Sequence, residues 1–305
     1  MKLHIQTPLI RADRLSKALG KEIYLKLEAL QPPGSFKIRG IGRLAQYFVT
    51  QGKTHLVASS GGNAGVAVAY AGMRLGVPVT VFLPTTSHQL FIDALRLYST
   101  DIRVVGEVWD ETHQAASQFA AQHDAAYIPP FDHPIIWQGH ATIIDELQQD
   151  GIKPDAIIAA VGGGGLACGL LHGLTQLQWQ DTTLLTAETE GAACFARSVA
   201  AGKLVTLSAI TSKATSLGAK QCAKQLFENT KQFTIIPNVI SDQAAAQACY
   251  RFADEQRLLV ELASGAALAV AYEQLPSIIA YNTIVIVVCG GLYTSVDILS
   301  DYSSC

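Results

Sequence analysis

The stretch Ala156-Ile157-Ile158-Ala159-Ala160-Val161-Gly162-Gly163-Gly164-Gly165-Leu166 joins an apolar run to a helix-forming segment through four consecutive glycines. An unbroken apolar run of this length is typical of a parallel strand that is buried on both faces. Glycines leave the backbone N–H groups uncovered, and a helix that begins there adds a partial positive charge. The stretch therefore predicts an α/β fold with an anion-binding loop at the carboxyl end of a strand.

Two other interpretations of the glycine loop remain open. A dinucleotide-binding loop has the pattern Gly-x-Gly-x-x-Gly and an acidic residue about twenty positions later, which Gly162, Gly164 and Glu188 match only loosely. The other interpretation is a tight turn that needs glycine only for close packing. A nucleoside-triphosphate loop is disfavoured because no Lys-Ser/Thr pair follows the glycines.

Strand-like and helix-like segments alternate along most of the chain. Strands are expected at 56–58, 77–83, 102–105, 156–161, 184–187 and 284–288. Helices are expected at 64–75, 87–98, 110–123, 140–149, 165–174, 242–255 and 265–275. The breaker-rich segments 32–34 and 129–134 predict two crossings between domains. We expect a large domain made of residues 1–31 and 135–305, and a small domain made of residues 32–134.

Composition narrows the function classes. Of the 305 residues, 49% are hydrophobic and 15% are charged, which is typical of a compact soluble protein. The net charge of −3 and the lack of a Lys/Arg cluster argue against a nucleic-acid partner. No apolar run is long enough for a membrane span, and the first eight residues lack a signal-peptide core, so the cytoplasm is the expected location. The six cysteines form no Cys-x-x-Cys pair and are expected to be reduced thiols.

Two further loops contain residues that could take part in catalysis or in ligand binding. Lys37 lies in Gly34-Ser35-Phe36-Lys37-Ile38-Arg39-Gly40, where it is either a surface lysine near a helix start or a nucleophile. A lysine becomes a nucleophile only when it is desolvated or bound as an imine. Ser59-Ser60-Gly61-Gly62-Asn63-Ala64-Gly65 forms a second strand-to-helix turn, whose N–H groups and Ser60 hydroxyl could hold a carboxylate or simply cap a helix.

Cys289 ends the last apolar strand, in Cys289-Gly290-Gly291. Open parallel sheets bind ligands at such carboxyl ends, although a cysteine here could equally be part of the core. If a ligand with a pyridine ring is bound here, a neutral thiol beside its nitrogen would leave that nitrogen unprotonated. An unprotonated ring favours β-elimination over transamination.

Taken together, these motifs resemble the fold-type II pyridoxal-phosphate enzymes, and among them the short L-serine/L-threonine dehydratases, in particular the serine dehydratase-like branch. The resemblance covers nearly the whole chain. It is carried by Thr7-Pro8-Leu9, Ser35–Gly40, Ser59–Gly65, the tetraglycine loop, Thr215–Ala219 and Cys289–Gly291. It implies two open, twisted, mostly parallel sheets flanked by helices, with pyridoxal 5′-phosphate in the cleft between the domains.

The resemblance also implies residue roles. Lys37 is expected to be the catalytic Schiff-base lysine. The other cofactor-binding residues are expected to be Phe36 on the ring, Asn63 on the phenolic oxygen, Ser216 facing the ring, Cys289 on the pyridine nitrogen, and Gly162, Gly163, Gly164 and Gly165 on the phosphate. Ser60, Gly61 and Asn63 are expected to bind the substrate carboxylate. Gly61 stands where more active dehydratases have alanine, which implies a roomier pocket.

A monovalent cation, usually potassium, is a further implication of the resemblance. The expected ligands are Gly162, Glu188, Ala192, Cys194, Leu217 and Ala219. Carboxylate and carbonyl oxygens suit such a cation, whereas the thiol of Cys194 does so less well. The alternative for Glu188 is a strand-end carboxylate that caps the next segment.

The function that the resemblance implies is deamination of L-serine or L-threonine by β-elimination, giving pyruvate or 2-oxobutanoate and ammonia. This is a lyase of amino-acid catabolism that acts on a small amino acid and is usually a homodimer. Serine racemase is one alternative, and a cofactor-binding protein with little turnover is another.

Overall fold

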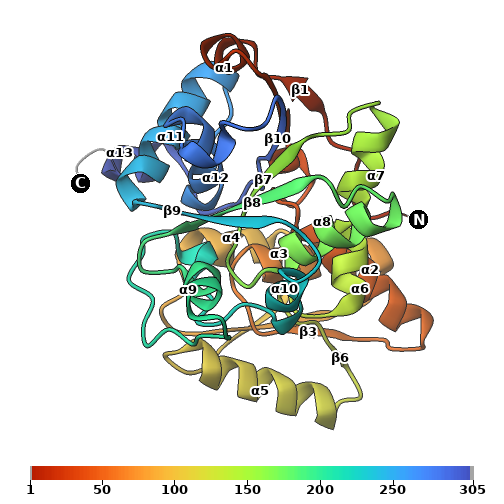
Figure 1. Ribbon diagram of the computed structural model, residues 1–305. Helices are drawn as coiled ribbons and strands as arrows, with labels where there is room; N and C mark the ends of the chain where they lie inside the picture. The colour runs from red at the N-terminus through yellow and green to blue at the C-terminus, as the bar shows by residue number, and fades with distance from the viewer. Residues whose placement is uncertain (1, 303–305) are drawn as a thin grey trace. The chain divides into compact units, whose positions relative to one another are not determined.

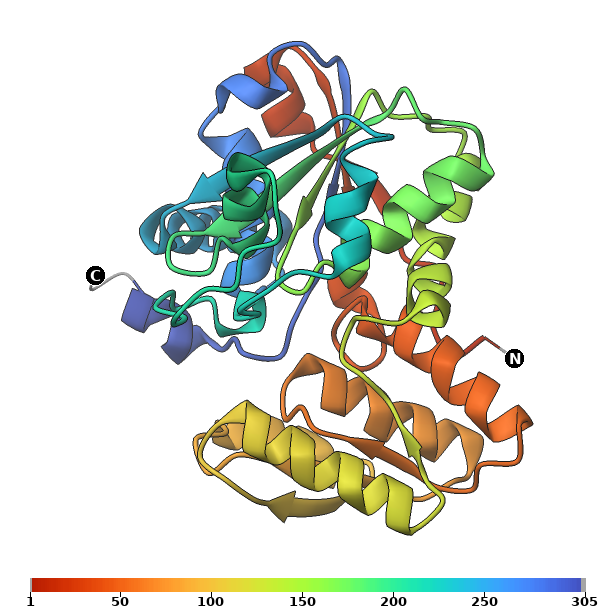
Figure 2. The ribbon, with the colours of Figure 1, turned by 60° about the horizontal axis from the view of Figure 1, so that its bottom comes forward.

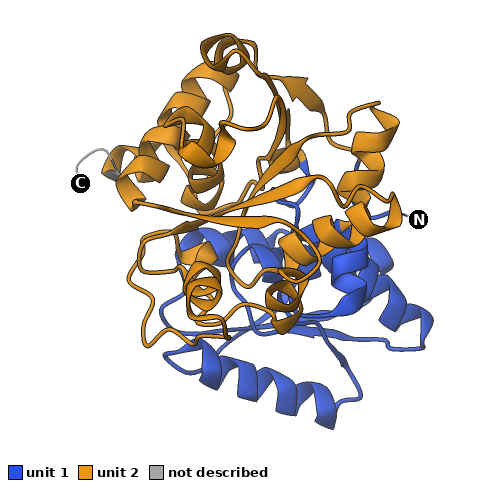
Figure 3. Ribbon diagram, in the orientation of Figure 1, with its two compact units in different colours: residues 1–5, 31–140 blue, residues 6–30, 141–305 orange. Residues whose placement is uncertain are grey.

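The computed structural model describes residues 2–302 and divides the chain into two compact units. Unit 1 comprises the residues up to Ile5 together with Gln31–His140, and unit 2 comprises Gln6–Leu30 and the residues from Ala141 onward (Figure 3). Each unit is an α/β layer structure built on its own sheet. The expected fold class is therefore confirmed.

Unit 1 contains a four-stranded parallel sheet with the order β5-β4-β3-β6. Its strands are β3 (Leu56–Ala58), β4 (Val79–Leu83), β5 (Asp101–Val104) and β6 (Ala126–Tyr127). Its helices are α2 (Lys37–Thr50), α3 (Asn63–Leu75), α4 (Gln89–Arg96), α5 (Trp109–Gln122) and α6 (Pro134–His140). Helix α5 covers one face of this sheet, and α3 with α2 covers the other (Figures 1 and 2).

Unit 2 contains a six-stranded sheet with the order β1-β2-β10-β7-β8-β9, in which only the β1–β2 pair is antiparallel. Its strands are β1 (Leu9–Arg11), β2 (Glu22–Lys26), β7 (Ala156–Ala160), β8 (Thr183–Thr189), β9 (Ile235–Ile240) and β10 (Thr283–Val287). Its helices are α1 (Asp13–Leu19), α7 (Thr142–Gln149), α8 (Gly165–Gln176), α9 (Cys194–Ala201), α10 (Lys224–Asn229), α11 (Asp242–Gln256), α12 (Leu262–Tyr272) and α13 (Val296–Tyr302). Short 3₁₀ turns lie at η1 (Glu28–Leu30), η2 (Thr215–Leu217) and η3 (Pro276–Ile278).

The core of unit 2 lies between its sheet and the helices on both sides. Every residue of β7 is buried, as its unbroken apolar sequence predicts. Helices α12 and α11 cover one face of the sheet, and α8 covers the other with α7 and α10 (Figure 1). One buried ion pair adds a polar link, because Lys26 Nζ on β2 lies 2.6 Å from Glu146 Oε2 on α7.

The unit boundaries differ from the expected domains at three places, because residues 2–5, Gln31 and the residues from 135 to 140 all belong to unit 1. Residues 2–5 belong to unit 1, because the Gln31 side chain bonds both the N–H and the carbonyl of Ile5, and Leu3 packs beside Gly42. Helix α6 also belongs to unit 1, because Gly139 packs on the backbone of α2. The expected helix 140–149 is correspondingly shorter and begins at Thr142.

The described residues bear on two further expectations, the lack of a membrane span and the reduced state of the cysteines. Within residues 2–302, no helix is both long and apolar enough to cross a membrane. All five cysteines in that part of the chain are free thiols, and the sixth, Cys305, lies outside it.

Candidate functional site

Parallel pairing brings the predicted loops of unit 2 to one edge of its sheet. Strand β7 pairs with β8 through Ala160 and Ala187, so the glycine loop leaves the sheet close to Glu188, which lies near the carboxyl end of β8. Strand β10 pairs with the other side of β7, which brings Cys289 to the same edge. This is the carboxyl edge, where open α/β sheets bind their ligands.

The same arrangement holds in unit 1. Strand β3 is followed by the loop 59–62, and its neighbour β6 is followed by Pro129 and Pro130. Ser59 Oγ lies 2.6 Å from the hydroxyl of Tyr127, which ties the two strand ends together. The predicted site residues therefore form two sets, each at the carboxyl edge of its own sheet.

Lys37 is the first residue of α2 and is only partly exposed. Its Nζ donates a hydrogen bond to the carbonyl of Pro130 at 3.1 Å and lies 5.0 Å from the centroid of the Phe36 ring. The amine is thus held at the carboxyl edge of the small sheet and does not point freely into solvent. Partial desolvation of this kind is what a lysine nucleophile requires.

His140, which the sequence did not single out, lies behind Phe36. The two ring centroids are 4.9 Å apart, and His140 is fully buried. A side chain at Gly40 would reach within 2.7 Å of the imidazole, so the ring packs directly on the α2 backbone. Within residues 2–302, neither ring nitrogen has a hydrogen-bond partner. Burial, and then the charges of Lys37 and Arg39, hold the pKa of His140 well below its usual value, so the ring is neutral at pH 7.

The loop that follows β3 is closely packed around its glycines. Asn63 begins α3 and is buried, whereas Ser60 is partly exposed. A side chain at Gly65 would overlap the carbonyl of Ser60, so that glycine permits the close approach of loop and helix. A Cβ at Gly61 would lie 2.5 Å from Leu83 Cδ2. The roomier pocket expected at Gly61 is therefore filled at this point by Leu83.

The tetraglycine loop has the geometry of an anion cradle. Gly164 has φ +88°, in the left-handed region that favours glycine, and α8 begins at the next residue. A Cβ at Gly162 would lie 3.0 Å from Leu217 Cα, which shows that η2 packs against the loop and brings Ser216 and Leu217 to it. Because α8 is twelve residues long and its start carries no side-chain cap, this loop fits a phosphate group. The glycines also serve close packing, so the two interpretations of the loop are compatible.

Glu188 is fully buried, with both carboxylate oxygens bonded to the start of α9. Oε1 accepts from Phe195 N at 2.8 Å, and Oε2 accepts from Ala196 N at 2.7 Å. Burial raises the pKa of Glu188 to about 7, although the two backbone bonds act in the opposite direction. The helix cap considered as an alternative is therefore present, and each oxygen retains a lone pair for another partner.

Of the other expected cation ligands, Cys194 and Leu217 contact Gly162 of the glycine loop. Cys194 Sγ donates to the carbonyl of Gly162 at 3.6 Å, and the hydrogen bond with Cys222, followed by burial and the nearby Glu188, raises the pKa of the Cys194 thiol. Ala219 N bonds the carbonyl of Leu217 at 2.8 Å, and Ala192 N bonds that of Thr189 at 2.9 Å. Among residues 2–302, no three His, Cys, Asp or Glu side chains form a cluster that could hold a metal ion. A cation here would need backbone carbonyls for most of its ligands.

Cys289 is buried at the carboxyl end of β10, with its Sγ 3.2 Å from the hydroxyl of Ser264. The two glycines that follow have φ values of +80° and +127°, which turn the chain sharply beside the thiol. Ser264 belongs to the first turn of α12, and sequence patterns gave no signal for it. Such a contact between distant segments becomes visible only in the folded chain.

Comparison with known proteins agrees with this architecture. The chain is 43% identical to the L-serine dehydratase/L-threonine deaminase of Bos taurus, with 95% of this chain and 91% of the relative aligned. It is 42% identical to the human serine dehydratase-like protein, with 94% and 90% aligned. The crystal structure of a fungal L-serine ammonia-lyase from Rhizomucor miehei superposes with a TM-score of 0.94 at 35% identity, covering 100% of this chain and 99% of that one.

Residues 1–290 match the family described as pyridoxal-phosphate dependent enzymes. The match spans both units and includes every predicted site residue. The partly buried Lys37 of unit 1 and the glycine loop at the start of α8 in unit 2 both lie within the matched residues. This chain belongs to the pyridoxal-phosphate dependent enzymes.

Proposed function

We propose that this chain removes the amino group of L-serine or L-threonine by β-elimination, producing pyruvate or 2-oxobutanoate and ammonia. The observation that carries the proposal is that the Lys37 amine is partly buried and donates a hydrogen bond to the Pro130 carbonyl. The relatives that are 42–43% identical to this chain include an L-serine dehydratase/L-threonine deaminase. A lysine in this state can serve both as an attachment point and as a base.

The proposal assigns the binding work to the loops at the two sheet edges. The N–H groups of Gly162–Gly165 at the start of α8 would hold the cofactor phosphate. Phe36 would contact the ring, Asn63 would donate to its phenolic oxygen, and Ser216 would face it. Cys289 would meet the pyridine nitrogen with its neutral thiol. When bound, pyridoxal phosphate supplies an electron-withdrawing ring that stabilises negative charge at the substrate α-carbon.

The proton transfers are assigned to Lys37 Nζ. Ser60, the backbone of Gly61 and Asn63 would orient the substrate carboxylate so that the α-hydrogen faces this amine. Nζ takes the α-proton, and the β-hydroxyl departs as water with a proton that Nζ returns. The Cα–H and Cβ–O bonds break and a Cα=Cβ bond forms; hydrolysis of the resulting enamine then gives the oxo acid and ammonia.

The test is a coupled assay of pyruvate and ammonia, comparing the wild type with Lys37→Ala. Lys53→Ala is a matched control, because Lys53 is another lysine of unit 1 and pairs with Asp124 at the surface. We expect loss of activity only in Lys37→Ala. Equal ammonia release from both variants would overturn the assignment, and accumulation of D-serine in chiral analysis would favour a racemase instead.

We also include in the proposal a monovalent cation near Glu188, a homodimer and a cytoplasmic location. The buried carboxylate and the Gly162 carbonyl support the cation, since both offer hard oxygen ligands. Sedimentation velocity would test the dimer, and it is contradicted by a single species of 32.5 kDa at micromolar concentration.

A further inference from the structure

The hydroxyl of Tyr127 lies between two partners at the carboxyl edge of the sheet in unit 1. It is 2.6 Å from Ser59 Oγ, directly after β3, and 2.7 Å from Nδ1 of His113 on α5. Ser117 Oγ is 3.5 Å from the same nitrogen, at the outer limit of a hydrogen bond. Three segments that are distant in sequence therefore meet at one hydroxyl group.

This hydroxyl can bond both partners at once. A tyrosine hydroxyl has one proton to donate and lone pairs that accept. If Nδ1 of His113 carries a proton, it donates to Tyr127, which then donates to Ser59. If Nδ1 carries none, Tyr127 donates to it and accepts from Ser59. The bond between Tyr127 and Ser59 therefore forms with either form of the imidazole.

The surroundings keep the Tyr127 hydroxyl in place. Its ring packs against a buried cluster that includes Val57 and Ala116. The imidazole of His113 stacks on the indole of Trp109, with the ring centroids 4.9 Å apart and the planes 3° apart. Burial raises the pKa of Tyr127, although the bond from Ser59 acts in the opposite direction, so the hydroxyl keeps its proton at pH 7. The hydroxyl is thus a fixed anchor for Ser59.

Ser59 directly precedes the loop that is proposed to bind the substrate carboxylate, and only 1% of it is exposed. Within residues 2–302, the N–H groups of Ser60 and Gly61 have no hydrogen-bond partner, so a ligand can bond them. Because these groups form no bonds within the chain, they do not hold the loop in place. The bond from the Ser59 side chain to Tyr127 fixes the start of the loop instead.

We propose that Tyr127 is a positioning residue which, through Ser59, places the N–H groups of Ser60 and Gly61 for the carboxylate of the amino-acid substrate. The inference rests on the proposed function of this loop. Tyr127 acts only through Ser59, and His113 acts by fixing the Tyr127 hydroxyl.

A pair of ligands tests the proposal without using activity. L-Alanine has the amine and the carboxylate of the substrate but no β-hydroxyl to eliminate, and ethylamine is L-alanine without the carboxylate. Absorbance titration of the holoenzyme measures the binding of each. Tyr127→Phe should bind L-alanine about three- to tenfold more weakly than the wild type, as expected for the loss of one hydrogen bond. It should bind ethylamine as tightly as the wild type does.

A double-mutant cycle tests whether Tyr127 acts through Ser59. Ser59→Ala should weaken the binding of L-alanine, and the double variant should bind it no more weakly than Tyr127→Phe alone. His113→Phe should cause a smaller loss, because the bond between Tyr127 and Ser59 remains. In the coupled assay, KM for L-serine should rise with the loss of affinity while kcat changes little, because the carboxylate is held alike before and during elimination.

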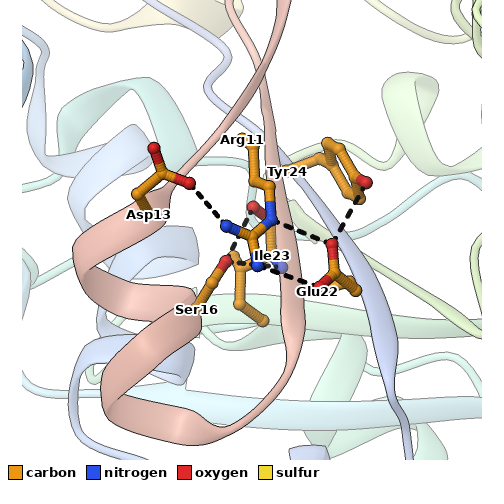
Figure 4. Close-up of polar contacts among 6 residues, drawn as sticks. All are labelled: Arg11, Asp13, Ser16, Glu22, Ile23 and Tyr24. Carbon is orange, nitrogen blue, oxygen red and sulfur yellow. Dashed lines mark hydrogen bonds and ion pairs between the residues drawn. The ribbon is translucent and has the colours of Figure 1, made fainter.

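Two matched controls remove hydroxyl hydrogen bonds elsewhere. Tyr70 is a buried tyrosine of the same unit, and its hydroxyl accepts from Arg74 Nη1 at 2.6 Å. Ser16 is a buried serine of unit 2, and its hydroxyl bonds the N–H and the carbonyl of Ile23 at 3.0 and 3.4 Å (Figure 4). Tyr70→Phe and Ser16→Ala should lower the thermal unfolding temperature and leave the affinity for L-alanine unchanged.

Three results would overturn the inference. Wild-type affinity for L-alanine in Tyr127→Phe shows that the hydroxyl does not position the loop for a carboxylate. Equal weakening of L-alanine and ethylamine shows that Tyr127 supports the whole site and not the carboxylate loop. Losses that add in the double variant show that Tyr127 does not act through Ser59. Failure of the proposed reaction looks different, because the wild type then forms no pyruvate while the titration with L-alanine still decides the role of Tyr127.

Discussion

At the scale of single residues, His140 has the most unusual environment. Its imidazole is fully buried, lies against Phe36, and has the charges of Lys37 and Arg39 and the ring of His4 nearby. A buried polar group without a hydrogen bond costs about 1–3 kcal/mol, so this arrangement is a local weakness that the rest of unit 1 must offset. Its consequence is a measurable dependence of stability on pH.

Because burial lowers the pKa of His140 below its unfolded value of 6.5, the unfolded chain takes up a proton that the native chain does not. Stability from this group is therefore present above pH 6.5 and lost as the pH falls below it, by up to about 1.4 kcal/mol per pH unit. Urea unfolding of the wild type and His140→Gln between pH 5 and 8 measures the difference. His123→Gln, which changes an exposed histidine, is the control. Parallel curves for the wild type and His140→Gln would contradict the prediction.

Gly61 gives a second prediction at this scale. An alanine there would place its Cβ 2.5 Å from Leu83 Cδ2 and 3.2 Å from Ser87 Oγ, so Leu83 must move. Overpacking of this kind costs about 1–3 kcal/mol of unfolding free energy. We expect Leu83→Val to relieve part of that cost, so the double variant should be more stable than the sum of the two single changes predicts. Gly62→Ala is the control, because a Cβ there meets only ordinary contacts at 3.8 Å. Simple additivity would contradict the packing argument.

At the scale of elements, the junction between β8 and α9 contains the fully buried carboxylate of Glu188. Burial raises the pKa of Glu188 from 4.5 to about 7, so this group stabilises the fold below pH 4.5, and that contribution is lost as the pH rises through about 7. The full difference corresponds to about 3 kcal/mol. A cation beside the carboxylate would offset the loss.

We therefore expect potassium chloride to stabilise the wild type more than tetramethylammonium chloride at equal ionic strength, and increasingly so from pH 6 to 8. Thermal unfolding of the wild type and Glu188→Gln measures the effect. The variant should lose both the dependence on pH from this group and the preference for potassium, because a neutral amide neither titrates in this range nor attracts a cation by charge. It keeps only part of the α9 cap. Identical curves in the two salts for the wild type would remove the proposed cation.

At the scale of the whole molecule, the sequence predicted the buried parallel strands and the loops at their carboxyl ends. Strand β9 was missed because Pro237 and Asn238 interrupt its apolar pattern, and the structure accommodates them at the sheet edge. Strand β2 was missed because it carries Lys26, whose charge is matched only by Glu146 on a distant helix. Periodicity reports what a segment buries, whereas such pairings arise from tertiary contacts.

The same distinction explains which site residues could be predicted. Lys37, the tetraglycine loop and Cys289 lie in short motifs whose chemistry is local. Ser264 and His140, in contrast, contact residues that are distant in sequence. Ser264 contacts Cys289, and His140 packs against Phe36 and against α2 at Gly40. The contacts that orient the motif residues therefore had to come from the structure.

Cofactor binding should stabilise the molecule as a whole, because a ligand that binds only the native state shifts the unfolding equilibrium. At a concentration one hundred times its dissociation constant, pyridoxal phosphate should add about 2.7 kcal/mol, which corresponds to a rise of roughly 5 °C in the unfolding temperature for a chain of this size. Lys37→Ala should retain part of this rise, since the phosphate cradle at Gly162–Gly165 is unchanged. Gly164→Val should lose most of the rise, because valine is strained at φ +88° and its side chain would crowd Leu226. Thermal scans with inorganic phosphate in place of the cofactor provide the control: a small rise in the wild type and Lys37→Ala, absent in Gly164→Val, is expected if the cradle binds phosphate. An equal rise with the cofactor in all three proteins would mean that neither the lysine nor the glycine loop contributes to its binding.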